Sequence, residues 1–159
     1  MDAVITFVDG NRPQWRKQYA KAVGGVPSFT RFRDWGTLRY LFRGLARNAS
    51  FIRNVYLVAS DEDQVPGWVN KKTVRVVTHP DFIPEKFLPT FSSNVIEMLL
   101  HNIPGLSEEF LYFNDDVFLL SPCSPEDFFV DGKPRLSPRI RTGRTTMFHE
   151  MIYNSTQTA

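Results

Sequence analysis

The sequence contains only one cysteine, Cys123, in 159 residues. A single cysteine excludes an internal disulfide and a metal cluster held by several cysteines. We therefore expect a protein of the reducing cytoplasm. No apolar run approaches the roughly 20 residues that a membrane-spanning helix needs, so we expect no transmembrane segment. The first residues carry no basic stretch ahead of their apolar ones, which argues against a secretory signal.

The chain also has little excess charge of either sign and lacks the commonest catalytic motifs. The formal net charge is only +2, which is too small to indicate a nucleic-acid partner. The chain contains no G-x-S-x-G, no P-loop and no G-x-G-x-x-G. The signatures of those hydrolase and nucleotide-binding families are absent, so any site has to be argued from other residues.

What is present is the composition of a soluble globular domain. Hydrophobic residues make up 42% of the chain and charged residues 23%. A chain of this length can bury one sizeable core. Because 14 of its residues are phenylalanine, we expect that core to be rich in aromatic rings.

Strand-like and helix-like segments alternate along the chain. Four short apolar segments have the composition of buried strands, at 3–8, 54–60, 73–79 and 109–115. Three segments have the apolar spacing of helices, at 11–23, 33–51 and 94–103. This alternation predicts an α/β fold with a mostly parallel sheet and helices on both faces.

Several details of these elements can also be predicted. Asn11 is placed to cap the first helix, and Met98 is expected to face inward from the last. The second helix should bury one face that carries Leu38, Leu41, Phe42 and Leu45. Residues 80–90 contain three prolines and are expected to form an irregular loop.

Polar residues follow each predicted strand. In parallel sheets, ligands bind at the carboxyl ends of the strands, near the point where the strand order reverses. The residues expected on this edge are Asp9, Ser60, Asp61, His79, Asn114, Asp115 and Asp116. Their convergence is the first indication of a site.

The adjacent carboxylates Asp115 and Asp116 carry most of this argument. They lie within the apolar stretch EFLYFNDDVFLL, where two like charges are costly to bury without partners. A divalent cation such as Mg²⁺ takes one or two protein carboxylates and completes its shell with phosphate and water. We therefore favour a cation-bound diphosphate site, while a turn or helix cap remains the alternative.

Three further motifs fit the same chemistry but have ordinary structural interpretations. Asp9 and Gly10 follow the first strand and could form a simple turn. The stretch RFRDWGTLRY supplies guanidinium groups that match phosphate oxygens, or a solvated helix face with Asp34 as its cap. Ser92, Ser93 and Asn94 begin a helix, where ordinary capping is the alternative to anion binding.

The histidines and the basic C-terminal segment are less informative. His79, His101 and His149 are each more typical of structural than of catalytic histidines, although any of them could act as a base near neutral pH. The arginines at 135, 139, 141 and 144 could bind a polyanionic acceptor, but a solvated loop is the simpler interpretation. We predict an α/β core at 1–122 and a basic, loop-rich segment at 123–159.

Taken together, these motifs resemble the Stealth family of capsular polysaccharide phosphotransferases and N-acetylglucosamine-1-phosphotransferases. The resemblance is carried in order by AVITFVDG, RFRDWGTLRYLFRGLARNASFIRNVYLVAS, QVPGWVN and LPTFSSNVIEMLLHNIPGLSEEFLYFNDDVFL. It extends from about residue 3 to about residue 120 and covers the family's first two conserved regions. Members continue into a third and a fourth region that supply a His and an Arg, and we expect the third to begin near Ala159. Trp35 stands where a polar residue is expected, which leaves the role of its neighbour Asp34 less certain.

The resemblance implies transfer of a sugar-1-phosphate from a nucleotide-sugar donor to a hydroxyl of an acceptor saccharide. It implies a nucleotide-diphosphosugar transferase fold of the GT-A type and a Mg²⁺ or Mn²⁺ cofactor. It places Asp115 and Asp116 at the metal or the reaction centre, with Arg39 beside them. The positions that would hold the donor are Asp9, Gly10, Arg33, Asp34, Ser93, Asn94 and Asn114.

Two alternatives remain open at the level of sequence. An ordinary glycosyltransferase would use the same nucleotide and metal but would release a nucleoside diphosphate. A non-catalytic domain would bind the nucleotide-sugar without turning it over. For the general base, the second Asp of the pair and His149 are both candidates.

Overall fold

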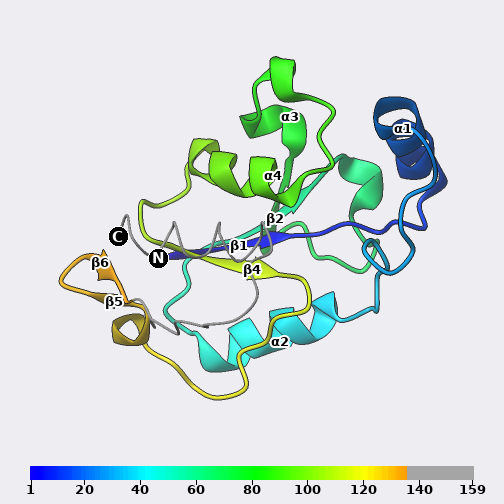
Figure 1. The fold of residues 1–159 in the computed structure, drawn as a ribbon. Helices are drawn as coiled ribbons and strands as arrows, with labels where there is room; N and C mark the ends of the chain where they lie inside the picture. The colour runs from blue at the N-terminus through cyan, green and yellow to red at the C-terminus, as the bar shows by residue number, and fades with distance from the viewer. Residues whose placement is uncertain (136–159) are drawn as a thin grey trace, which may run out of the picture. The chain divides into compact units, whose positions relative to one another are not determined.

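A four-stranded parallel sheet forms the centre of the protein, as the computed structural model of the chain describes it for residues 1–135 (Figure 1). Its strands are β1 (Asp2–Thr6), β2 (Val55–Ala59), β3 (Val74–Thr78) and β4 (Phe110–Asn114). They lie in the order β3-β2-β1-β4, and all three neighbouring pairs are parallel. This confirms the predicted sheet and all four predicted strands.

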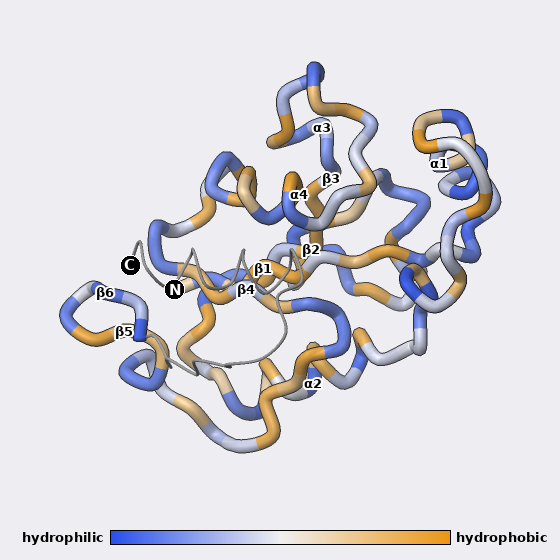
Figure 2. The backbone as a smooth tube through the Cα atoms, in the orientation of Figure 1, coloured by the Kyte–Doolittle hydropathy of each residue, from blue (hydrophilic) through white to orange (hydrophobic). Residues whose placement is uncertain are grey.

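Helices cover both faces of this sheet, as predicted. The helix α2 (Leu38–Asn48) lies on one side, and α3 (His79–Phe82) and α4 (Ser93–Leu99) lie on the other (Figure 1). Leu38, Leu41 and Leu45 are buried on α2, which matches the predicted face. Polar and apolar residues alternate along this helix (Figure 2). Such an α/β arrangement is consistent with a GT-A-like fold.

A core of apolar side chains packs α3, α4 and the residues that follow them onto one face of the sheet. Side chains alternate between the two faces of a strand, so residues two apart share a face. One face of the sheet contributes Val4, Tyr56, Val58 and Val77 to a cluster that also contains Phe82, Ile83, Leu100 and Ile103. All are at most 8% exposed, so this layer is dry and close-packed.

The strand order reverses at β1. From β1 the chain crosses to β2 and then to β3, and it returns to place β4 on the other side of β1. In open α/β sheets this switch point opens a crevice at the carboxyl ends of the two strands. Here the crevice lies beyond Thr6 and Asn114, which are paired across the sheet.

A buried carboxylate links the strands at their amino ends, opposite the switch-point crevice. Asp2 is fully buried, and its oxygens accept hydrogen bonds from Arg53 at 3.1 and 3.0 Å and from the backbone of Ser107 at 2.9 Å. Asn54 donates to the same carboxylate at 2.9 Å. Burial alone would raise the pKa of Asp2, but these donors hold it well below its usual value. One side chain thus joins the starts of β1, β2 and β4.

Three local predictions were wrong. Met98 is 76% exposed, and Ile96 and Leu99 pack against the core in its place. The region 80–90 is not wholly irregular, because it contains α3 and the short helix η2 (Glu85–Phe87). The helix α1 (Pro13–Val23) has Arg12, not Asn11, at its N-cap position, and no side chain caps it.

The remaining described residues form a small second unit that begins at Ser124. It contains the short helix η4 (Pro125–Asp127) and a hairpin of β5 (Phe129–Val130) and β6 (Lys133–Pro134). The predicted division of the chain at residue 122 remains a prediction. Within residues 1–135, no helix is both long and apolar enough to cross a membrane.

Candidate functional site

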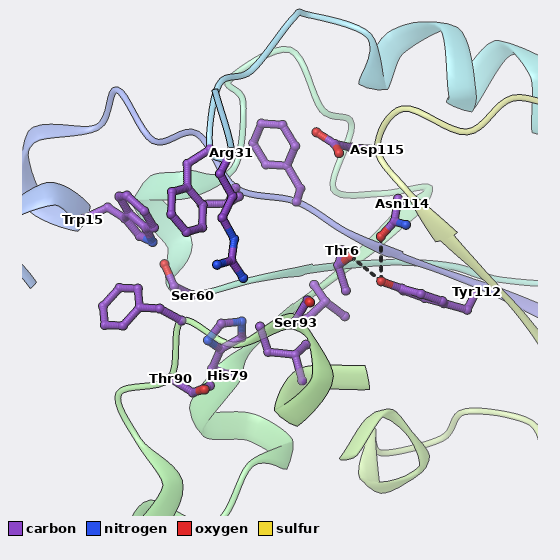
Figure 3. A pocket seen from close by; sticks show the side chains of 16 residues that line it. Thr6, Trp15, Arg31, Ser60, His79, Thr90, Ser93, Tyr112, Asn114 and Asp115 are labelled. Carbon is purple, nitrogen blue, oxygen red and sulfur yellow. Dashed lines mark hydrogen bonds between the residues drawn. The ribbon is translucent and has the colours of Figure 1, made fainter. Parts of the chain in front are cut away.

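A pocket of about 250 Å³ opens at the switch point of the sheet (Figure 3). Residues from the ends of all four strands reach it, together with residues from α1, from the loop before α2 and from the start of α4. The polar lining consists of Thr6, Arg31, Ser60, His79, Thr90, Ser93, Tyr112, Asn114 and Asp115. The predicted convergence of strand-end residues is therefore correct for Ser60, His79, Asn114 and Asp115.

Asp115 is the carboxylate of the acidic pair that lines the pocket. It follows β4 directly, and the Thr37 hydroxyl donates to its backbone carbonyl at 3.2 Å. Its side chain is half-buried, and burial raises its pKa to about 6, with smaller contributions from the negative charges of Asp116 and Asp34. A carboxyl group in this state gains strongly from a nearby cation.

Asp116 is exposed and does not line the pocket. No group of three or more His, Cys, Asp or Glu residues within 1–135 is arranged to hold a metal ion. A cage made entirely of protein ligands is therefore not formed by this part of the chain. Two adjacent carboxylates nevertheless suit Mg²⁺, which usually takes one or two of them and draws its other ligands from water and substrate phosphate. Cation binding by Asp115 and Asp116 remains a prediction.

A hydrogen-bonded chain fixes the polar edge beside Asp115. The Tyr112 hydroxyl donates to Asn114 Oδ1 at 2.8 Å and lies 3.0 Å from the hydroxyl of Thr6 (Figure 3). Since the only phenolic proton goes to Asn114, Thr6 must donate to Tyr112. Burial raises the pKa of Tyr112 to about 12, so the phenol keeps that proton. The side-chain amide of Asn114 is thereby held with its nitrogen free to donate.

The other part of the lining is aromatic. Trp15 packs on Phe32 and Phe91 with ring centroids 5.0 and 5.5 Å apart, and Tyr19 packs behind the same two rings. Arg31 lies with its guanidinium carbon 5.2 Å from the centre of the Phe32 ring. These residues come from α1, from the loop 24–37 and from the segment before α4, which no pattern in the sequence brings together.

His79 lines the same pocket from the end of β3. Its ring is only 8% exposed and stands edge-on to Phe82, with centroids 6.3 Å apart. Burial lowers its pKa to about 4, and the charge of Asp61 only partly opposes this shift. At neutral pH the imidazole is therefore neutral, with one nitrogen that donates and one that accepts.

Several residues predicted to hold substrate do not line this pocket. Asp9 pairs with Arg12 at 3.4 Å and accepts from the backbone of Asn11 at 2.9 Å. Arg33 stacks on Trp35, with its guanidinium carbon 3.4 Å from the ring centre. Their substrate-binding roles remain predictions.

Arg39, Asp34 and Asn94 are also absent from the pocket lining, whereas Ser93 belongs to it. Arg39 lies over the ring of Trp68 at 5.4 Å. Asp34 does not cap α2, whose N-cap is Thr37, but accepts from the backbone of Gly36 at 2.7 Å. The negative charge of Asp34 still contributes to the raised pKa of Asp115.

Gly10 does not line the pocket but packs closely against Phe32, which does. Its backbone N–H donates to the carbonyl of Phe32 at 2.8 Å. A Cβ at this position would lie 2.5 Å from that carbonyl oxygen, so no larger residue fits without moving the loop. Gly10 thus sets the position of Phe32, which does line the pocket.

Two lining residues could have been found from the sequence. Tyr112 lies two positions before Asn114 on a predicted strand, so both side chains point to the same face. Arg31 belongs to the arginine-bearing motif but was not singled out within it. His149, one of the proposed bases, lies outside the described residues.

Comparison with known proteins gives a consistent result. A family model described as "Stealth protein CR2, conserved region 2" matches residues 31–136. The chain is 43% identical over 154 residues to a receptor polysaccharide phosphotransferase, WefC, of Streptococcus oralis, covering 88% of this chain and 46% of that protein. It is 41% identical over 140 residues to an exopolysaccharide phosphotransferase, cps2G, of Lactiplantibacillus plantarum, covering 85% and 41%.

A third relative, the exopolysaccharide phosphotransferase SCO6021 of Streptomyces coelicolor, is 45% identical over 148 residues, covering 87% of this chain and 27% of that protein. The chain therefore spans less than half the length of these relatives.

Proposed function

Because the chain belongs to the Stealth family, we propose that it binds a nucleotide-sugar and serves the transfer of sugar-1-phosphate to a hydroxyl of an acceptor saccharide. The names of its relatives describe phosphotransferases of capsular, receptor and extracellular polysaccharides. A role in making such a polysaccharide follows from this proposal. The expected cytoplasmic location stays a prediction.

The observation that carries the proposal is the place of Asp115. This carboxylate is half-buried at the switch point of a parallel sheet, and its pKa is raised by burial and by two neighbouring negative charges. No residue within 1–135 forms an ion pair with it. A folded protein keeps such a group where a positively charged ligand offsets its cost.

We propose that Asp115 and Asp116 would hold a Mg²⁺ or Mn²⁺ ion when the donor is bound. Such an ion, when bound, neutralises the negative charge that builds up on the phosphate oxygens as the donor is cleaved. The protein then has to place the two substrates and exclude water.

In the proposed reaction an acceptor hydroxyl attacks the phosphorus that carries the sugar. A new oxygen–phosphorus bond forms, and the bond from that phosphorus to the bridging oxygen of the diphosphate breaks. The products are a phosphodiester and a nucleoside monophosphate. The proton of the hydroxyl goes to a general base, and since Asp116 holds the ion in this scheme, His149 is the remaining candidate.

Other lining residues have positioning roles in this scheme. Arg31 offers a guanidinium that matches phosphate oxygens. The chain of Thr6, Tyr112 and Asn114 holds the Asn114 amide toward the same edge, where it can donate to a sugar or phosphate oxygen. Each contact orients the donor without changing its charge.

The identity of the released nucleotide tests this proposal. The purified protein is incubated with a panel of UDP-, CDP- and GDP-sugars, Mg²⁺ and oligosaccharide acceptors, and the nucleotides are separated by chromatography. We expect a nucleoside monophosphate and a phosphodiester product. A nucleoside diphosphate would instead identify a glycosyltransferase, and Mg²⁺-dependent binding without any turnover would identify a non-catalytic binding domain. Either result contradicts the proposal.

A further inference from the structure

The pocket has two chemically different ends. Trp15, Ser60, His79 and Thr90 gather at one end, and Thr6, Tyr112, Asn114 and Asp115 gather at the other (Figure 3). The guanidinium of Arg31 lies between the two groups in this view. One end is therefore aromatic and uncharged, and the other is polar and acidic.

Rings form the walls of the uncharged end. Phe32 and Phe91 are only half-buried although each packs against Trp15. Together with Trp15 they leave aromatic surface facing the cavity. Such surface is well suited to stack on a flat ring, as aromatic side chains do with nucleobases in proteins that bind nucleic acids.

His79 adds hydrogen-bonding capacity to these walls. Only 8% of His79 is exposed. Even so, residues 1–135 provide no hydrogen-bond partner for its ring. The cavity is the direction from which a ligand could satisfy the two nitrogens, and Figure 3 shows the ring directed into it. Neither ring nitrogen is among the fully buried, unpartnered polar atoms of the described residues, so an occupant of the cavity can reach both.

The hydroxyls beside His79 are partly committed. Ser60 donates to Asp61 Oδ2 at 3.0 Å and so can only accept from a ligand. Thr90 Oγ1 accepts from the backbone of Ser92 at 3.3 Å and keeps its proton for donation. The uncharged end thus offers both donors and acceptors at its rim, next to aromatic faces.

We propose that this uncharged end is a subsite for a flat nitrogen heterocycle, the nucleobase of the donor, which stacks on the aromatic wall and hydrogen-bonds to His79. The inference rests on the proposed function for the identity of the ligand. It goes further by assigning a direction to the donor: base at the aromatic end, diphosphate past Arg31, and sugar toward Asp115.

Charge favours this direction over the reverse. A diphosphate at the aromatic end would meet no cationic side chain of the lining other than Arg31. A base beside Asp115 would leave the metal-binding carboxylates without phosphate to share.

Separate probes for the two ends of the donor test the inference. Uridine, cytidine, adenosine and guanosine report on the base alone, and magnesium pyrophosphate reports on the phosphate end. Saturation-transfer NMR measures nucleoside binding to the intact chain and shows which ligand protons lie nearest the protein. We expect the strongest saturation on base protons, with one or two of the four nucleosides preferred.

Two substitutions and a matched control sharpen this test. Phe91→Leu keeps an apolar side chain but removes a ring, and we expect a loss of about tenfold in nucleoside affinity, equivalent to ~1.4 kcal/mol. His79→Gln keeps a donor and an acceptor in other positions, and we expect it to change the preference among the four nucleosides. His101→Gln alters an exposed histidine that does not line the pocket and should change nothing. Magnesium pyrophosphate should bind all three variants as it binds the parent protein.

The outcomes separate this inference from the proposed function. If no nucleoside binds the parent protein, or if the Phe91 and His79 variants weaken pyrophosphate and nucleosides equally, the subsite is not where we place it. If nucleosides bind as expected but nucleotide-sugars release no monophosphate, the subsite stands and the proposed transfer is wrong. Thermal unfolding of each variant shows that the fold is intact in every comparison.

Discussion

At the scale of single residues, the protein contains two carboxylates in opposite environments. Asp2 is buried among the donors of Arg53, Ser107 and Asn54, which outweigh the effect of burial and keep its pKa low. Asp115 is partly buried without such donors, and its pKa rises to about 6. The first group stabilises the fold, whereas the second is held at a cost that a ligand can offset.

The Asp2 cluster gives a prediction about stability. Asp2→Asn removes the charge that the three donors share, so we expect the free energy of unfolding to fall by about 3 kcal/mol in urea denaturation. Glu62→Gln is the control, because it removes a carboxylate from the exposed ion pair with Lys71. Exposed pairs contribute little, so this change should be much smaller. Equal effects of the two substitutions would contradict the account of the cluster.

His79 gives a prediction about pH. Its pKa is about 4 in the folded protein and about 6.5 when unfolded, so the unfolded state binds more protons between these values. Its contribution to stability is fully present above pH 6.5 and is lost as the pH falls toward 4, by about 3 kcal/mol in total. Asp115 acts in the opposite sense, because its raised pKa favours the folded state below pH 6.

The difference between the parent protein and His79→Gln isolates the histidine from Asp115. Urea denaturation of both proteins at several pH values measures it. We expect the parent to lose stability relative to the variant as the pH is lowered from 6.5 to 4. A difference that stays constant with pH would show that the folded protein accommodates the imidazolium.

At the scale of elements, α2 positions the segment that carries the acidic pair. Thr37 at its N-cap donates to the carbonyl of Asp115, and Asn48 in its last turn donates to the carbonyl of Leu119 at 2.6 Å. Between them, Gly44 lies against the backbone of Leu119. These contacts with α2 and its N-cap fix the position of the backbone at Asp115 and Leu119.

Gly44→Ala tests this support. Alanine normally stabilises a helix interior relative to glycine by about 1 kcal/mol. Here the new Cβ would lie 3.1 Å from the Leu119 carbonyl oxygen, so we expect little or no gain in stability and weaker binding of a nucleotide-sugar with Mg²⁺. Ala46→Gly, on an exposed position of the same helix, should lower stability and leave binding unchanged. A stabilised Gly44→Ala variant with normal binding would contradict the proposed role of the contact.

Sequence patterns predicted the regular elements well because hydrophobic burial decides them. The period of Leu38, Leu41 and Leu45 specified α2 and its buried face. The prediction failed at Met98 because it chose the wrong face of the segment 94–103, where Ile96, Leu99, Leu100 and Ile103 are the residues that pack against the core. These four residues also follow the i, i+3, i+4, i+7 spacing of a helix, so the apolar spacing alone did not choose between the two faces.

At the scale of the whole molecule, strand order explains why the site is where it is. Alternating strands and helices predicted a parallel sheet and a polar edge, and that edge did bring Asn114 and Asp115 to a pocket. The aromatic end could not be predicted. Trp15 comes from α1, Phe32 from the loop before α2 and Phe91 from the segment before α4, and no sequence pattern links the three. Contacts between distant segments depend on how the chain closes, which local patterns do not specify.

The central claim is that Asp115 holds a cation-bound nucleotide-sugar at this switch point. Calorimetric titration of the protein with UDP-, CDP- and GDP-sugars, with and without Mg²⁺, tests it most directly. We predict that one donor binds only with Mg²⁺ and that Asp115→Asn weakens this binding by at least about tenfold, while Asp63→Asn, an exposed acidic residue outside the pocket, leaves it unchanged. Binding that is indifferent to both Mg²⁺ and Asp115, or no binding of any donor, would contradict the claim.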